Sequence, residues 1–119
     1  TYTGHVTAAR DWDAPAEQRW VRPAHRDSYE HMLYDTRMDR FFLPLGGDVA
    51  GALGGPALER AIGVVYRPET ELASHYFPAA IGAQFDAVFH LDETNAVEPL
   101  EVTRHWARHE PPDTYPSGL

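Results

Sequence analysis

Histidines and carboxylates that lie near one another in the chain are the residues whose types and spacing could carry out acid–base chemistry. His90 precedes Asp92 in one stretch, while His5 and His75 lie in separate stretches. A histidine assisted by a carboxylate can activate water, because a general base needs a tuned pKa and reach to the proton. The candidate bases are therefore His5, His75 and His90. His75 is favoured because it falls in a predicted loop, whereas His90 falls within an apolar run.

Other catalytic chemistries find less support in the sequence. Imidazole and carboxylate suit divalent metals, but the histidines show neither HxH nor HExxH spacing, so we expect no metal and no cofactor. Ser28 and Ser74 do not lie in a GxSxG motif, and Ser28 is better explained as a helix cap. The sequence has no cysteine, which excludes a thiol nucleophile and disulfides and is typical of a reducing cytoplasm.

Length and charge limit the class of protein. The chain of 119 residues is enough for one domain. Its net charge of −8 would repel a nucleic-acid backbone, so we expect no nucleic-acid partner. No apolar run approaches the roughly 20 residues that span a membrane, so we expect no membrane partner and a cytoplasmic location.

Two apolar runs are expected to position the chemistry. Ala61–Tyr66 and Phe85–Leu91 are short, rich in β-branched and aromatic residues, and bounded by turn-forming residues. Their near-continuous apolarity predicts neighbouring central strands of one parallel sheet covered on both faces. The second run ends in the polar stretch Asp92–Asn95. Ligands often bind at such strand ends in open α/β sheets, although a solvated turn is the alternative interpretation.

Earlier in the chain, Thr1–Ala9 reads as a strand and Asp11–Arg26 as an irregular surface loop anchored by two tryptophans. A helix is predicted to start at Asp27 or Ser28 and to run to Thr36. Its apolar stripe consists of Tyr29, Met32, Leu33 and Thr36.

The other predicted elements are short. Phe41–Leu45 reads as an edge strand and the glycine-rich stretch Gly46–Pro56 as a flexible connector, because it lacks a phosphate-loop motif. Arg67–Glu71 reads as a turn and Ala79–Gln84 as one helical turn. Residues 101–119 read as an extended surface tail, pinned by a tryptophan.

Long stretches of this chain resemble the erythromycin esterase-like family. They include Glu59–Glu71, Ser74–Phe77 and Gln84–Leu100. Thr1–Ala9 and Ser28–Glu30 also resemble it, as does the closing stretch 114–119.

The resemblance implies an α/β fold, here the C-terminal portion of a three-layer structure with a parallel or mixed sheet flanked by helices. The best-known members of the family hydrolyse the lactone of macrolide antibiotics, which confers resistance, with water activated by histidine and glutamate and without a metal. Some relatives are fused to a phosphoribosyltransferase domain. The implied substrate is a small-molecule ester or lactone.

The sequence departs from the family in its catalytic residues. The family's catalytic glutamates and histidines are expected in segments before Thr1, so none can be transferred to a position here, and His5 stands where a small hydroxyl residue is expected. This predicts a chain that supplies one wall of a cleft and is inactive alone. The weak catalytic candidate is His75, and the substrate-binding candidates are Tyr2, His5, His75 and Tyr76.

A second interpretation is a non-catalytic domain that binds a ligand or associates with itself. A partial sheet leaves open edges, which recruit partners. We therefore expect a homodimer, or association with the N-terminal portion of the enzyme. The expected contact surfaces are the Tyr2–Val6 strand, the Met32/Leu33 face and Tyr76–Phe77.

Overall fold

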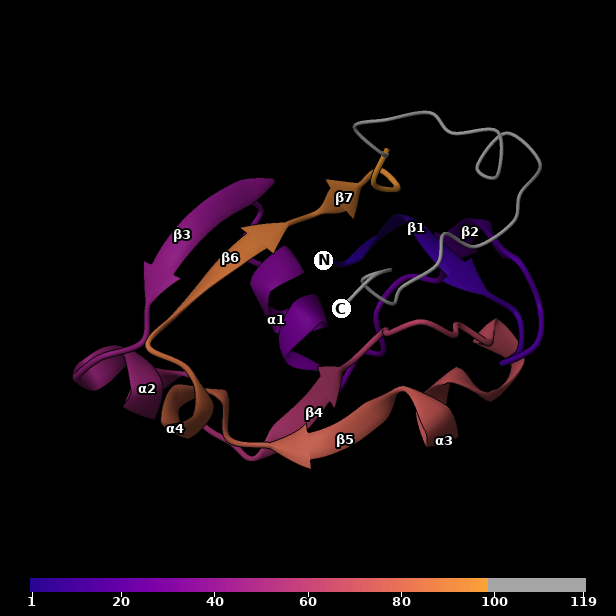
Figure 1. The fold of residues 1–119 in the computed structure, drawn as a ribbon. Coiled ribbons are helices and arrows are strands. Elements are labelled where there is room, and N and C mark those ends of the chain that lie inside the picture. The colour runs from indigo at the N-terminus through magenta and orange to yellow at the C-terminus, as the bar shows by residue number, and fades with distance from the viewer. Residues whose placement is uncertain (99–119) are drawn as a thin grey trace, which may run out of the picture.

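A computed structural model describes residues 1–98, so the tail predicted for 101–119 lies outside the described residues. Short strands and helices surround a central helix, α1 (Tyr29–Tyr34), as Figure 1 shows. The other elements, in chain order, are β1 (Thr3–Ala9), β2 (Ala16–Val21), β3 (Arg40–Pro44), α2 (Asp48–Ala52), β4 (Ala57–Arg60), the 3₁₀ turn η1 (Pro68–Thr70), α3 (Glu71–Ser74), β5 (Tyr76–Ala79), α4 (Ile81–Gln84), β6 (Ala87–Leu91) and β7 (Glu93–Thr94). The α/β class predicted from the sequence is confirmed.

The strands form three small sheets rather than one. The largest has the order β2-β1-β7 and is mixed, because β1 pairs antiparallel with β2 and parallel with β7. The other two are antiparallel pairs, β3 with β6 and β4 with β5. In Figure 1 the β3–β6 and β4–β5 pairs lie on different sides of α1.

The predicted pairing of Ala61–Tyr66 with Phe85–Leu91 is wrong. Residues 61–66 form no strand and make only an isolated bridge between Val65 and Ala9. Val64 is 70% exposed, so the run is not covered on both faces. The strand within the second run is β6, which pairs with β3. Apolar composition alone could not separate a buried strand from an extended segment that crosses the end of β1.

The loop predicted for Asp11–Arg26 is also wrong in part. Within it, β2 pairs with β1 along its whole length, from Ala16 beside Ala9 to Val21 beside Gly4. The two tryptophans do not anchor the segment, since Trp12 is 78% exposed and Trp20 is 54% exposed.

Helix α1 begins where the sequence indicates. Ser28 is the N-cap, and its hydroxyl accepts a hydrogen bond from the His31 backbone N–H at 3.2 Å. Tyr29 and Leu33 are buried, while Met32 is 38% exposed, so the predicted stripe is only partly in the core. The helix ends at Tyr34, two residues earlier than predicted.

Within residues 1–98 the core consists of two small clusters. One contains Ala8, Val21 and Tyr66. The other contains Tyr29, Leu45 and Ile81, which pack between α1, α4 and the β3–β6 pair. The predicted edge strand at 41–45 and the helical turn at 79–84 are confirmed as β3 and α4, whereas the glycine-rich connector contains α2.

Gly4 allows the close approach of β1 and β7. Its φ is +135°, and a Cβ there would lie 2.1 Å from the backbone oxygen of Thr94. Only glycine fits this position without moving the β7 backbone.

We expect Gly4→Ala to lower the free energy of unfolding by about 3 kcal/mol or more, because backbone strain and loss of the β1–β7 pairing combine. Gly51→Ala is the matched control. A Cβ at Gly51 meets no atom within 4 Å, and alanine should stabilise α2 by about 0.5–1 kcal/mol. Urea denaturation followed by circular dichroism measures both variants, and equal stabilities would contradict the assigned role of Gly4.

Candidate functional site

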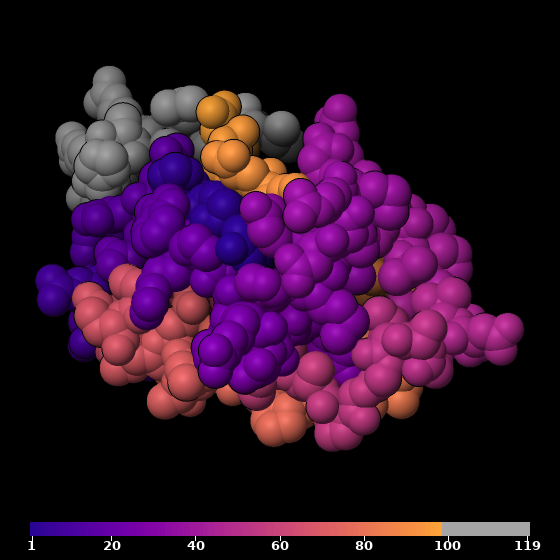
Figure 2. Space-filling model, turned by 180° about the vertical axis from the view of Figure 1, so that it is seen from behind, coloured from indigo at the N-terminus to yellow at the C-terminus, as the bar shows by residue number. Residues whose placement is uncertain are grey.

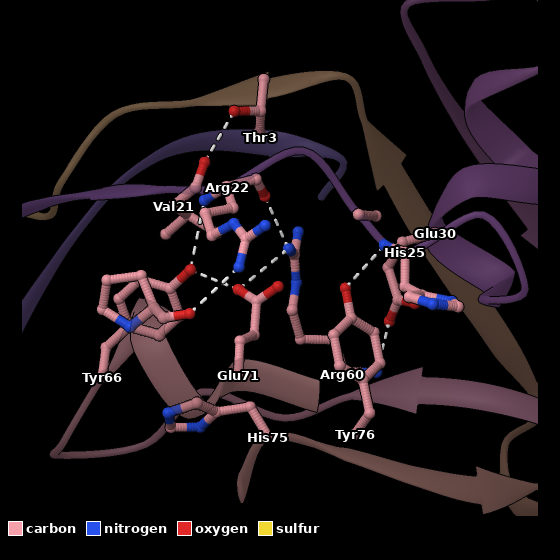
Figure 3. A network of polar contacts seen from close by, with 12 residues as sticks. Thr3, Val21, Arg22, His25, Glu30, Arg60, Tyr66, Glu71, His75 and Tyr76 are labelled. Carbon is pink, nitrogen blue, oxygen red and sulfur yellow. Dashed lines mark hydrogen bonds and ion pairs between the residues drawn. The ribbon is translucent and has the colours of Figure 1, made fainter. Parts of the chain in front are cut away.

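A buried arginine connects the β4–β5 pair with the chain segments that flank β1 and β2. The side chain of Arg60, at the end of β4, is 2% exposed. Its Nη2 donates to the backbone oxygens of Thr1 and Tyr2, both at 2.9 Å, and its Nη1 donates to that of Arg22 at 2.7 Å. Figure 3 shows the guanidinium pointing toward Glu71, whose Oε2 lies 3.5 Å from Nη1.

Glu71 connects this arginine to a buried tyrosine. The Tyr66 hydroxyl donates a short hydrogen bond to Glu71 Oε2 and accepts one from the Arg22 N–H at 3.1 Å. Burial, followed by the hydrogen bond to Glu71, raises the pKa of Tyr66 to about 12. The phenol therefore stays neutral and acts as a donor within the fold.

Two further carboxylates lie beside Arg60. Glu30 Oε1 accepts from the Arg60 backbone N–H at 3.0 Å, but its Oε2 is buried without a hydrogen-bond partner among the described residues. The same holds for Glu59 Oε2. Burial and the nearby charge of Glu30 raise the pKa of Glu59. Neither carboxylate lines the hollow at the end of β6 or the hollow beside His75.

His75, the favoured sequence candidate, has both ring nitrogens engaged with backbone. The Arg67 N–H donates to Nε2 at 3.0 Å, and Nδ1 lies 3.2 Å from the Ala61 oxygen. Since Nε2 accepts, the proton must be on Nδ1, which donates to Ala61. The ring also packs on Tyr66, with centroids 5.1 Å apart. His75 thus holds the segment 61–67 in place.

A polar hollow of about 310 Å³ lies at the end of β6. It is lined by Tyr34, Asp35, Arg37 and Asp92. The first three come from the last turn of α1 and the residues after it, and Asp92 joins β6 to β7. The sequence left this strand end open between a ligand site and a solvated turn, and the structure has a hollow there.

Neighbouring side chains fix the walls of this polar hollow. His90 is buried, and its Nε2 lies 2.7 Å from Asp92 Oδ1. Tyr34 stacks on Tyr2, with ring centroids 3.7 Å apart and 6° between the planes. Figure 2 shows the N-terminal residues side by side with those that follow β6, in keeping with the β1–β7 pairing.

A second hollow, of about 320 Å³, lies beside His75. Its lining includes Trp12, Val64, Val65, Arg67 and Ser74. This surface is more apolar than the first, and the His75 nitrogens are already used. It offers packing surface rather than acid–base chemistry.

The structure does not bring the four predicted substrate-binding residues together. Tyr2 supports the polar hollow through Tyr34, and His75 lines the other one. Tyr76 is buried under Arg60, and its hydroxyl accepts from the His25 N–H at 2.9 Å. His5 is exposed on β1, beside Trp20 of β2.

Sequence reasoning missed Arg37 altogether. Its backbone φ is 62°, a left-handed conformation that only glycine adopts freely, and no local sequence signal indicates it.

Within residues 1–98, no group of three or more histidines and carboxylates is arranged to hold a metal ion. None of the helices described is long and apolar enough to cross a membrane.

Comparison with known proteins gives one family. The family model described as Erythromycin esterase matches residues 1–94, which is most of the chain. No solved structure matches this chain.

The buried phenol predicts a pH dependence of stability. The folded pKa of Tyr66, about 12, lies above the ordinary value of 10.0, so its contribution is complete below pH 10 and is lost as pH rises toward 12. Burial raises the pKa of Tyr76 in the same direction. We therefore expect Tyr66→Phe to make the alkaline decrease in unfolding free energy shallower without abolishing it. Urea denaturation across this range tests it, with the half-exposed Tyr34→Phe as control, and an unchanged slope in Tyr66→Phe would contradict the assignment.

Proposed function

This chain belongs to the erythromycin esterase family, and on that premise we propose that it is the C-terminal part of a hydrolase that opens an ester or lactone with water. The observation that carries the proposal is the match to the family over residues 1–94. The substrate is a small molecule, and the water is activated by a histidine with help from glutamate.

The groups that activate water come, in this proposal, from segments other than this one. His75 supports this view, because both of its nitrogens bind backbone and neither is free to take a proton. His90 is buried and directed at Asp92. The described part of the chain thus presents oriented acceptors and donors, which is what a cleft wall requires.

The wall itself is the polar hollow at the end of β6. Asp92 and Arg37 line it, and Tyr2 supports it from behind. The Arg60 network holds Tyr2 through its backbone oxygen. Of the substrate-binding candidates, Tyr2 therefore acts by positioning, while His75 and Tyr76 pack against Tyr66 and Arg60 of the buried network.

We expect the isolated chain to be inactive toward erythromycin, and the natural coding sequence before Thr1 to supply histidine and glutamate segments that restore hydrolysis. Mass spectrometry of the macrolide detects ring opening by the gain of one water. His75→Gln should lower the stability of the active protein but spare its turnover per folded molecule, because only the packing of 61–67 is lost. Turnover by the isolated chain that disappears in His75→Gln would overturn the proposal. So would a gene that begins at Thr1.

We also propose that the isolated chain forms a homodimer through the outer face of the β3–β6 pair. Phe42 is 55% exposed and Phe89 79% exposed, and their rings form a cross-strand pair 4.9 Å apart. Each of these strands has one edge without a strand partner among the described residues. The surfaces predicted from sequence suit this role less well, since Leu33 and Tyr76 are buried. A two-fold contact would cover the apolar face.

Sedimentation equilibrium at micromolar concentration should give a dimer for the natural chain and a monomer for Phe89→Arg. Arginine in the apolar contact would bring a buried unpaired charge into both subunits. Leu72→Arg is the matched control, because Leu72 is 56% exposed but lies on α3, away from this face. A monomeric natural chain, or dimers in both variants, would contradict the proposal.

A further inference from the structure

The polar hollow at the end of β6 contains more hydrogen-bonding capacity than its own residues use. Asp92 receives one contact, from His90, and Asp35 one, from His31 Nε2 at 3.5 Å. An ionised carboxylate can accept about four hydrogen bonds. Arg37 has five N–H donors, and no hydrogen bond or ion pair of its guanidinium is found among residues 1–98. Both donors and acceptors are therefore left for a ligand.

The backbone at Arg37 adds an independent reason to look for a ligand here. Its φ of 62° follows directly on the last turn of α1, where its N–H donates to the Tyr34 oxygen at 3.1 Å. A non-glycine residue keeps this conformation only at a cost, and such residues concentrate at ligand sites. Glycine would fit this turn with less strain, yet the chain has an arginine there, and this arginine lines the hollow.

Ring packing supports the aromatic wall. Tyr34 is fixed by stacking on Tyr2, whose ring is also edge-on to His31 at 5.6 Å. One face of the Tyr34 ring is covered by Tyr2, and Tyr34 also lines the hollow. A ligand with an apolar surface could pack there without ordering a mobile side chain.

The charges of the walls decide the class of ligand. Two carboxylates against one guanidinium repel an anion on balance, and Arg37 opposes the attraction of a simple cation to the carboxylates. Neighbouring hydroxyl groups carry no charge and both donate and accept. The volume of about 310 Å³ is at the lower end for small-molecule sites, which fits a single ring.

We propose that this hollow binds a neutral, hydroxyl-rich ring, with Asp92 and Asp35 accepting from its hydroxyls, Arg37 donating to them and Tyr34 packing on its apolar side. The inference deepens the proposed function and rests on it for calling this ring part of the substrate. Binding itself is a property of the residues described.

A titration of the isotopically labelled chain, followed by NMR, tests the inference. Methyl glucoside should shift the amide signals of Asp35, Arg37 and Asp92 in a saturable way. Tetrahydropyran, which is the same ring without hydroxyls, should not shift these signals. Acetate and ammonium should not shift them in a saturable way either. Saturable binding of acetate or ammonium, or equal binding of tetrahydropyran, would overturn the assignment of ligand class.

Arg37→Gly separates binding from folding. It removes the guanidinium and relieves the backbone, so its thermal midpoint should equal or exceed that of the natural chain, while its affinity for methyl glucoside falls about tenfold, the loss of one charged hydrogen bond. Asp92→Asn should lose affinity similarly, and the exposed Asp13→Asn is the matched control. Unchanged affinity in Arg37→Gly would overturn the inference.

Hydrolysis by the longer protein is a separate readout. Activity without glucoside binding refutes only this site, and binding without activity refutes only the hydrolase assignment.

Discussion

The buried guanidinium of Arg60 is the interaction on which the arrangement of this small protein depends. It accounts for four contacts to groups that lie far apart in the sequence, namely the oxygens of Thr1, Tyr2 and Arg22 and the carboxylate of Glu71. A buried charge is tolerated only when its donors are satisfied, and removing one partner leaves a costly unpaired group. The apolar clusters are small, so this polar centre determines how the β1–β2–β7 sheet sits against β4 and α3.

The same centre reaches the surface where a ligand is proposed. Arg60 binds the backbone oxygen of Tyr2, which also accepts from the Ala24 N–H at 2.9 Å. With its backbone held at this point, the Tyr2 ring provides a fixed platform for Tyr34. A binding wall on short elements needs such support, because first-contact groups are only as well placed as the residues behind them. The hollow is thus a consequence of the buried network rather than a separate feature.

The sequence predicted those elements whose signals are local. β1, the capped start of α1, the edge strand β3 and the helical turn α4 follow from alternation, a Ser cap and Pro or Gly boundaries. Ala61–Tyr66 was mistaken for a core strand, because its coverage depends on neighbours that no local pattern reveals. The polar strand end at Asp92 was left open between a ligand site and a solvated turn, and Arg37 was not indicated at all, since its left-handed backbone is imposed by the chain leaving α1. The family was recognised from long stretches of similar residues, which composition and periodicity could not have supplied.

The two histidines illustrate what sequence context cannot decide. His75 lies in a short connection and is the histidine that the sequence favours for function, whereas His90 lies in a strand and is the less favoured candidate. Both are buried, and the difference lies in what their nitrogens contact. His75 is bound at both nitrogens by backbone, while His90 directs Nε2 at a side chain that lines a hollow. An ionised Asp92 can only accept, so His90 must donate to it, and the carboxylate is thereby held in one orientation with acceptor positions left over. The histidine in the strand, not the one in the connection, is therefore the one coupled to a surface where a substrate could bind.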